Sequence, residues 1–282
     1  MSSNIRFAKQ LNDDIRAVLA LGSRAVLVTL VESSRLSVGS KLLIRDDQST
    51  SGDLGDPTLN AAMAVAAEKF LTGRDEARTF RVNEFAPELS EFADSSVLFE
   101  RIEVEPHLVV AGAGHVGAAL ARLAALVRYR VTLIDDRGEF VAREMFTSPL
   151  ERLIELVSSA SWVDMIRDAV GNGHGVSIAI VTRGHKQDED CLRAALSANP
   201  DYIGMIGSKR RTNIVLDKLR EEGFDEGQLQ KVRAPIGLDI GAVSPEEVAL
   251  AIMAEIVAER RGRAGGSLSA WRRLNTDKSR LH

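Results

Sequence analysis

A glycine-rich segment in the middle of the chain has the spacing of a phosphate-binding loop. Its G-x-G-x-x-G residues are Gly112, Ala113, Gly114, His115, Val116 and Gly117. In such loops the first glycine permits a tight turn, the second lets a pyrophosphate approach the backbone, and the third allows close helix–strand packing. The free N–H groups of the following helix attract the phosphates. The segment therefore predicts a dinucleotide site, and a Rossmann-like fold without a ligand is the alternative.

An acidic residue follows the glycines at the distance that a dinucleotide site requires. Asp135 ends the next apolar segment, 18 residues after Gly117. A carboxylate there can accept hydrogen bonds from ribose hydroxyls. It would repel a 2′-phosphate, which disfavours NADP, although Arg137 nearby weakens this argument. We assign Asp135, Asp136 and Arg137 to the cofactor site.

Three more segments follow apolar strands and contribute further candidate residues. Ligands of doubly wound sheets bind beyond the carboxyl ends of the strands, where these segments should lie. A Gly-Ser pair at a helix start followed by cations favours an anion site, and a solvated basic face is the alternative. The cofactor-binding candidates from these segments are Thr182, Gly184, Gly207, Ser208, Lys209, Arg210 and Gly237.

The candidate catalytic residues are His115, His185 and Asp188. A neutral imidazole within or beside the phosphate loop could exchange hydrogen bonds with a cofactor or substrate atom, and a structural polar role is the alternative for each histidine. We assign no metal ligands. The single cysteine, Cys191, excludes a cysteine-based zinc site and an intramolecular disulfide. Its apolar neighbours favour a buried, inert core residue over a soft ligand for molybdenum or copper.

The second part of the chain alternates strand and helix patterns. Continuous apolar strands alternating with helices predict an α/β, Rossmann-like, doubly wound parallel sheet. The expected strands are 108–111, 130–134, 176–181 and 202–206, and the expected helices are 116–127, 189–196, 209–222 and 245–260.

The first hundred residues predict a small α+β domain. We expect helices over 1–22 and 58–71, strands over 25–31, 41–44, 78–82 and 97–104, and a loop or turn over 46–57. The pattern changes at the Glu105-Pro106 pair. We therefore expect an N-terminal domain over 1–105, a Rossmann dinucleotide-binding domain over 106–262 and a basic tail over 263–282.

Composition and charge narrow the function classes. The chain has 282 residues, a net charge of −4 and 45% hydrophobic residues, which is ordinary for a globular protein and excludes a fibrous or disordered chain. A mildly acidic body argues against nucleic acid as the main partner. Residues 260–282 carry seven basic side chains and one acidic one, a charge of +6, either as a solvated tail or as a docking tail for an acidic partner. We expect a cytoplasmic protein without a signal peptide or stable membrane insertion.

The ordered motifs resemble one family, across about 107–262. The segments 112–117, 134–137, 182–188, 202–209, 235–241 and 244–256 look like the XdhC/CoxI family. The resemblance implies an accessory or maturation factor of a molybdenum hydroxylase, such as xanthine dehydrogenase or carbon monoxide dehydrogenase. It implies transient handling of the molybdenum cofactor, a client molybdoenzyme apoprotein as partner, and further maturation proteins as additional partners.

The N-terminal part departs from the family pattern. The family's Gly-Ser-x-Pro-Arg and Gly-Gly-Cys motifs are replaced here at residues 32–39 and 52–57, without the proline–arginine pair or the cysteine. This departure puts cysteine-based cofactor binding in doubt. A shortened, cysteine-poor member looks most like the CoxF-type branch associated with carbon monoxide dehydrogenase.

Three functions remain open on the residues alone. The first is a maturation factor with a bound dinucleotide, the second a dinucleotide-dependent oxidoreductase acting on a small molecule, and the third an NAD-sensing regulatory module. The small first hundred residues, which contain no histidine, argue against a separate substrate domain. The glycine pattern is shared by FAD and NAD sites. We favour FAD, because a maturation factor that keeps its flavin needs no substrate domain for hydride delivery.

Overall fold

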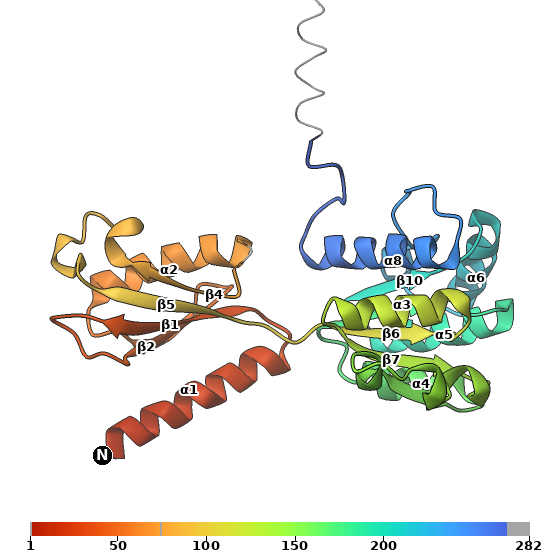
Figure 1. Ribbon diagram of the computed structural model, residues 1–282, viewed down its shortest axis with the longest axis horizontal. Coiled ribbons are helices and arrows are strands. Elements are labelled where there is room, and N and C mark those ends of the chain that lie inside the picture. Colours follow the sequence, from red (N-terminus) through yellow and green to blue (C-terminus); the bar gives the residue numbers. More distant parts are fainter. Residues whose placement is uncertain (1, 74, 270–282) are drawn as a thin grey trace, which may run out of the picture. The chain divides into compact units, whose positions relative to one another are not determined.

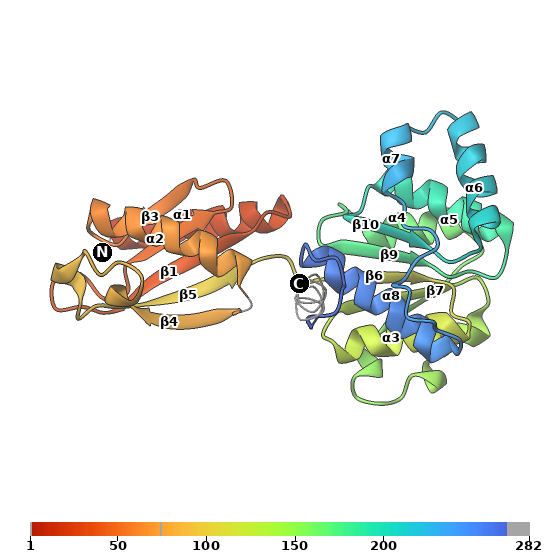
Figure 2. The ribbon, with the colours of Figure 1, turned by 90° about the horizontal axis from the view of Figure 1, so that it is seen from above.

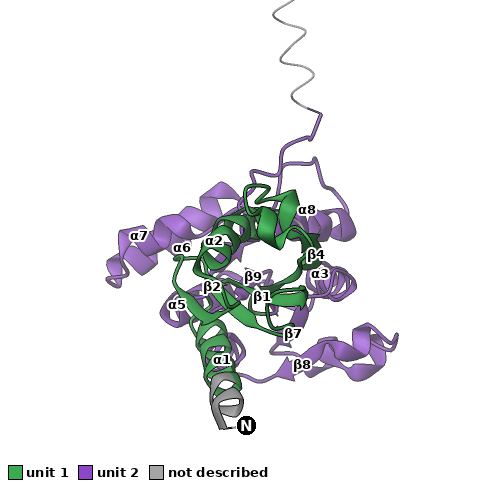
Figure 3. Cartoon of the chain, turned by 90° about the vertical axis from the view of Figure 1, so that its left-hand side faces the viewer, with its two compact units in different colours: residues 1–104 green, residues 105–282 purple. Residues whose placement is uncertain are grey.

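A computed structural model describes residues 2–73 and 75–269. The chain divides into two compact units, Met1–Val104 and Glu105–His282, one residue before the predicted boundary (Figure 3). Most of the predicted basic tail, 270–282, lies outside the described residues. No helix in the described part of the chain is long and apolar enough to cross a membrane.

The first unit is built on a five-stranded antiparallel sheet. The strand order is β3-β2-β1-β5-β4. Helix α2 covers one face of this sheet and helix α1 covers the other (Figure 1). The elements are α1 (Ser2–Ala20), β1 (Ala25–Glu32), β2 (Lys41–Arg45), β3 (Thr50–Asp53), α2 (Pro57–Thr72), β4 (Ala77–Arg81) and β5 (Ser96–Ile102), with short 3₁₀ turns at Val82–Glu84 and Ser90–Phe92.

Both faces of the central strand β1 are buried, which explains its unbroken apolar sequence. Val26 and Val28 pack beneath α2 together with Met63, whereas Ala25 and Leu27 pack on the α1 side. The predicted loop over 46–57 is wrong in part, because residues 50–53 form β3. Its Thr-Ser-Gly-Asp sequence carries no apolar alternation, and pairing with β2 creates the strand.

The second unit is a doubly wound parallel sheet, as the alternation of strands and helices predicted. The strand order is β10-β9-β6-β7-β8, and all neighbours are parallel. Its strands are β6 (His107–Ala111), β7 (Arg130–Asp135), β8 (Glu155–Ser158), β9 (Val176–Ile180) and β10 (Tyr202–Met205). Its helices are α3 (His115–Leu126), α4 (Trp162–Val170), α5 (His185–Ala198), α6 (Lys209–Glu221), α7 (Glu226–Lys231) and α8 (Pro245–Arg260), with 3₁₀ turns at Gly138–Val141, Arg143–Met145 and Glu151–Leu153.

Two helical layers bury the two faces of this sheet. Leu108 and Val110 of β6 face the layer of α3 and α8, whereas Val109 and Ala111 face the layer that contains α4 and α5 (Figures 1 and 2). Beyond β10, the backbone at Arg233 donates to Ile203 O and accepts from Met205 N, at 2.9 Å each, and so extends the sheet edge. The α/β Rossmann-like class with a small N-terminal α+β unit is confirmed.

Three elements of the second unit were not predicted, and the predicted start of a fourth, α5, lies too late in the sequence. Strand β8 and helix α7 are only four and six residues long, so their periodicity is weak. Helix α4 has nine residues and was missed although its buried residues Trp162, Met165, Ile166 and Val170 have helical spacing. The predicted start of α5 at Glu189 is wrong, because the helix begins at His185. His185, Lys186 and Gln187 are polar and exposed or half-buried, so the apolar pattern is visible only further along.

Candidate functional site

The predicted site lies at the carboxyl ends of three adjacent strands. In the sheet β6 stands between β9 and β7, so the segments that follow these strands are neighbours (Figure 2). The strand order reverses at β6, because β7 and β8 lie on one side of it and β9 and β10 on the other. Sheets of this type bind ligands in the crevice at such a point. The fold therefore brings together the glycine loop, the Asp135–Arg137 segment and the Thr182–Gly184 segment.

The three glycines of the loop have different surroundings. Gly112 has φ +111°, and a Cβ atom there would lie 2.6 Å from the Val181 carbonyl oxygen. A Cβ on Gly117 would overlap the Gly112 carbonyl oxygen. A Cβ on Gly114 would meet no atom within 4 Å. The first and third glycines are thus required by the fold itself, whereas the middle one borders open space at the start of α3.

The amino end of α3 is open to an anion. Gly114 is the N-cap residue, no side chain in the described part of the chain caps this end, and the first turn carries no acidic residue. His115 is the first helical residue and is exposed. The N–H groups of this turn and the dipole of α3 can hold a phosphate group, so the loop fits the pyrophosphate of a dinucleotide.

Asp135 supports the glycine loop from the buried side, and its carboxylate is not directed at the open space beside Gly114. Its carboxylate is 1% exposed and accepts hydrogen bonds from the Ala113 N–H (2.8 Å) and the Arg137 N–H (3.0 Å). The Arg137 guanidinium adds two more, at 2.9 and 3.1 Å. Burial raises the pKa of Asp135, but these hydrogen bonds outweigh it and leave the pKa below its ordinary value. A ribose would have to compete with Arg137 for these oxygens, so this residue fits the predicted ribose role less well than the glycines fit theirs.

A second ion pair, between Arg183 and Asp136, joins the segments on either side of the glycine loop. Arg183, after β9, donates to both carboxylate oxygens of Asp136, after β7, at 2.7 and 2.9 Å. Arg183 is 44% exposed and Asp136 is 22% exposed. The pair connects the neighbours of β6 at the edge where the loop emerges, so it borders any ligand that approaches Gly114.

The third predicted acid, Asp188, is fully buried. Its carboxylate contacts the Thr182 hydroxyl and the Arg211 guanidinium, which links the start of α5 to β9 and to α6. Burial raises the pKa of Asp188, although the hydrogen bond from Thr182 and the charge of Arg211 oppose this shift. These contacts give Asp188 and Thr182 a positioning function in the scaffold at this edge.

The remaining predicted residues lie at the same edge but in different environments. His185 is exposed at the first turn of α5, and Lys209 and Arg210 are exposed at the first turn of α6, after Gly207. The Ser208 hydroxyl caps α6 by accepting from the Arg211 N–H at 3.3 Å.

Gly237 has φ +107° and lies against the backbone of α8, where Glu255 accepts its N–H at 2.8 Å. The structure thus places Gly237 in close approach to a neighbouring helix, and its role in cofactor binding stays a prediction.

Two arginines at this edge were not among the predicted site residues. Arg183 lies inside the predicted Thr182–Gly184 segment, and Arg211 is the third cation of the run that starts at Lys209. Their cationic type was visible in the sequence. Their partners, Asp136 and Asp188, are 47 and 23 residues away along the chain, so only the fold reveals the pairs.

Two further groups lie away from the site. Cys191 is fully buried in the core between the sheet and α5, and burial raises the pKa of its thiol well above the ordinary value. At the opposite edge of the sheet, the ring of His107 exchanges a 2.9 Å hydrogen bond with Thr132, which donates to Glu155 at 2.9 Å. Burial, with the Arg130 charge, lowers the pKa of His107 to about 4. Sequence analysis did not identify this buried group.

Comparison with known proteins agrees with the fold. A family model described as the XdhC Rossmann domain matches residues 108–256, more than half of the chain. A second model, described as the XdhC and CoxI family, matches residues 18–83. The fold and the glycine loop define a Rossmann-domain protein with an additional N-terminal unit. The chain belongs to the XdhC family.

Three curated relatives share parts of this chain. The uncharacterized protein YqeB of Escherichia coli is 31% identical over 163 residues, 58% of this chain and 29% of its own length. A protein of Bacillus subtilis, named as a probable subunit of xanthine dehydrogenase, is 29% identical over 167 residues, 59% of this chain and 47% of its own length. The molybdenum cofactor insertion chaperone PaoD of E. coli is 36% identical over 69 residues, 24% and 22% of the two chains. The chain spans less than half the length of each relative.

One solved structure has the same fold over most of the chain. The crystal structure of a xanthine dehydrogenase from Bacillus halodurans matches with a TM-score of 0.59 and 21% identity, covering 90% of this chain and 67% of that one. This likeness supports the arrangement of elements within the fold, and at this level of identity it carries no information about activity.

Proposed function

We propose that this protein is an accessory factor of a molybdenum hydroxylase and that it acts with a dinucleotide bound at the glycine loop. The observation that carries the proposal is the open amino end of α3. Gly114 borders free space there, whereas Gly112 and Gly117 are held by contacts of the fold. Membership of the XdhC family supports the accessory role. One relative is named as a molybdenum cofactor insertion chaperone and another as a probable xanthine dehydrogenase subunit, which supports a molybdoenzyme as client.

FAD is the dinucleotide that we favour, and NAD is the alternative. The pyrophosphate would be held by the N–H groups of the first turn of α3. Lys209 and Arg210 would attract a second anionic group, either another phosphate of the dinucleotide or a phosphate of the molybdenum cofactor during its transient passage. Both side chains are exposed at the helix start behind Gly207-Ser208. When bound, a flavin would supply redox chemistry that these side chains lack.

The finer part of the proposal concerns the client. We infer a client of the carbon monoxide dehydrogenase type and a place in the CoxF-type branch, because the first unit lacks the Pro-Arg and Gly-Gly-Cys motifs. Other maturation proteins would share the task of handing over the cofactor. Pull-down with the apoproteins of a carbon monoxide dehydrogenase and of a xanthine dehydrogenase separates the two clients, and preference for the xanthine enzyme would contradict the branch assignment.

The dinucleotide is tested by releasing bound nucleotide from the freshly purified protein and identifying it by chromatography and absorbance. Gly114→Val should abolish binding, because its side chain would fill the space that a pyrophosphate needs. Gly266→Val is the matched control, since a Cβ at Gly266 also meets no atom within 4 Å but lies far along the chain from the loop. Equal nucleotide content in the two variants would refute the site.

A further inference from the structure

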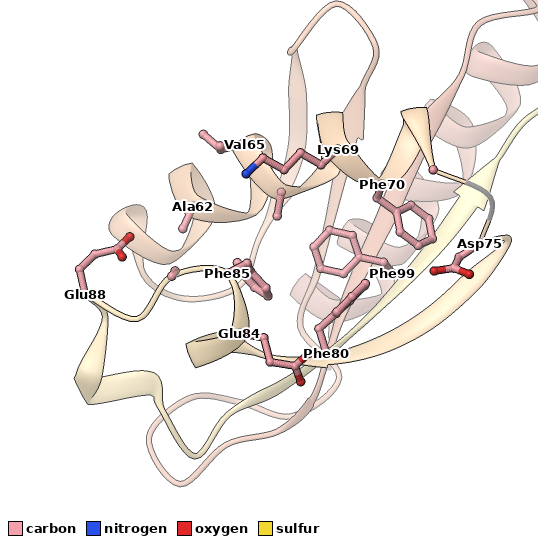
Figure 4. Close-up of a pocket in the computed structure, with 13 residues that line it drawn as sticks. Ala62, Val65, Lys69, Phe70, Asp75, Phe80, Glu84, Phe85, Glu88 and Phe99 are labelled. Atoms are coloured by element: carbon pink, nitrogen blue, oxygen red, sulfur yellow. The ribbon is translucent and has the colours of Figure 1, made fainter. Parts of the chain in front are cut away.

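The first unit contains an apolar cavity that the proposed function does not use. It has a volume of about 370 Å³ and lies between α2 and the β4 side of the sheet (Figure 4). The cavity is in the range of about 300–1,000 Å³ that is typical of sites for organic groups. Its apolar surface comes mainly from four phenylalanines, with small residues of α2 opposite them: Phe70, Phe80, Phe85, Phe99, Ala62 and Ala66.

The phenylalanine rings form a preorganised aromatic surface. The Phe80 and Phe99 rings meet edge to face, with centroids 5.4 Å apart and an interplanar angle of 82°. Phe85 completes the cluster, 6.3 Å from Phe80 and 6.1 Å from Phe99. Phe99 is 1% exposed, whereas Phe80 and Phe85 remain half-buried. The edge-to-face arrangement of the rings is favourable and holds the cluster in place. The accessible faces of Phe80 and Phe85 can therefore pack against one large apolar side chain.

The charged rim of the cavity is mainly acidic. Among the described residues, Asp75, Glu84 and Glu88 line it together with one ammonium group, that of Lys69 (Figure 4). Asp75 is already paired with Arg78 at 3.3 Å. Glu88 has no ion-pair partner among the residues that the structure describes, so Glu84 and Glu88 leave one end of the rim negative. An occupant with cations beside its apolar group would complement this charge.

The strand that carries Phe80 is also an edge of the sheet. β4 is the last strand in the order, paired on one side only, with β5. Glu76 accepts from Arg101 N–H and Val82 donates to Ser95 O, so residues 76, 78, 80 and 82 bond to β5. Residues 77, 79 and 81 therefore direct their backbone groups outward. The Arg81 N–H donates to Glu84 Oε1 at 3.0 Å, whereas the edge at Ala77 and Thr79 has no partner strand among the described residues and can pair with another strand.

We propose that this α2–β4 groove docks an extended segment of a partner protein. The segment adds as a strand to β4, inserts one large apolar side chain among the phenylalanines, and places Lys or Arg side chains near Glu84 and Glu88. Backbone pairing would supply affinity, and the pocket would supply selectivity, as in other cases of strand addition. The inference rests on the proposed function in one respect, that the chain acts on another protein.

The test uses the full-length protein and a fluorescein-labelled peptide in which Lys and Thr alternate around one central Phe. Fluorescence anisotropy should show saturable binding that weakens as salt is added. Ala66→Leu, which fills the cavity, should weaken binding about tenfold, a change of about 1.4 kcal/mol. Ala61→Leu is the matched control, because Ala61 is exposed on the same helix and does not line the cavity.

Two further comparisons test the edge and the charge. Thr79→Pro removes one outward N–H at a position where an edge strand tolerates proline, and should also weaken binding, as should N-methylation of alternate peptide residues. Glu88→Lys should weaken binding and flatten its salt dependence, whereas Glu68→Lys, outside the cavity on α2, should affect both much less. Circular dichroism verifies that each variant is folded.

Three results would overturn the proposal. The first is absence of peptide binding to the unmodified protein, and the second is equal affinity for the N-methylated peptide. The third is competition by phenethylamine at the same concentrations as the peptide, which would make the groove a small-molecule site. Nucleotide content is measured in the same samples. If the unmodified protein contains nucleotide but does not bind the peptide, only the docking groove is refuted. If it binds the peptide but contains no nucleotide, only the dinucleotide proposal is refuted.

Discussion

Replacing Asp135 by alanine should destabilise the second unit far more than the same change at Asp136. Without Asp135, the N–H of Ala113, itself 1% exposed, loses its 2.8 Å acceptor in a buried place. An unsatisfied buried donor costs about 1–3 kcal/mol. Arg137 also loses its ion pair, but it is 28% exposed and water can solvate it, so this adds about 1 kcal/mol at most. We expect the free energy of unfolding to fall by about 1–4 kcal/mol.

Asp136→Ala provides the matched control, because it removes the same chemical group one residue away. Its pair with Arg183 is partly exposed on both sides, so the expected loss is about 0–1 kcal/mol. Urea unfolding followed by tryptophan fluorescence measures both variants. Trp162 is buried in the core of the second unit, so its signal reports on that unit; Trp271 lies outside the described residues and is replaced by Phe in both variants and in the reference protein. Equal losses in the two variants would refute the view that Asp135 braces the loop from a buried position.

The protonation of Asp135 gives an independent check with a defined sign. Its pKa is lowered in the folded protein from an ordinary value of 3.8. The unfolded chain therefore binds the proton more readily, and the stabilisation is present above pH 3.8 and lost as the pH falls through the folded pKa. The Asp135→Ala variant should lack this acid-sensitive contribution. If the free energy of unfolding of the variant falls at acid pH as steeply as that of the unmodified protein, the lowered pKa of Asp135 is contradicted.

Three other predictions follow from single contacts. His107, with its pKa lowered to about 4 from 6.5, must take up a proton on unfolding, so stability should fall by about 2 kcal/mol from pH 7.5 to pH 5. His107→Gln should remove that part of the slope, and an identical pH profile would contradict the buried neutral ring. Gly117→Ala should destabilise the second unit strongly and Gly114→Ala little, since only the former meets a backbone oxygen; similar thermal midpoints would refute this. Ser244→Ala removes the N-cap that forms a capping box with Glu247 at the start of α8, and should lower the free energy of unfolding in urea by about 1 kcal/mol. An unchanged free energy of unfolding would show that the cap does not stabilise α8.

The architecture of the second unit was predictable because burial on both faces leaves a continuous apolar signal. Leu108–Ala111 read as one buried strand, and the helix Pro245–Arg260 was predicted with the bounds observed, because Pro245 and the two following glutamates mark its start. The short elements β8 and α7 escaped prediction for the opposite reason, because their few residues alternate too briefly to distinguish helix from strand. Helix α4 was missed although its apolar residues have helical spacing after the N-cap Ser161, which is a readable signal.

The position of the candidate residues at the strand ends was predictable, but the orientation of their side chains was not. The glycine spacing located the loop, because it reflects local backbone sterics. The spacing placed Asp135 at the correct strand end, yet could not reveal that Ala113 and Arg137 occupy its oxygens. The Asp136–Arg183 pair depends on the strand order, which brings segments distant in sequence side by side. Long-range pairs of this kind require the three-dimensional fold.

The burial of Cys191 turns the chain's single thiol into a kinetic reporter. It is 0% exposed, and its raised pKa keeps it protonated at neutral pH, so an alkylating reagent can reach and react with it only after the core opens. When reclosing is faster than labelling, the modification rate measures the equilibrium population of the opened form. Labelling of the unmodified protein with and without nucleotide would therefore measure the opening free energy around α5. Because Cys191 does not react in the folded protein, a cysteine introduced on the surface can be labelled selectively.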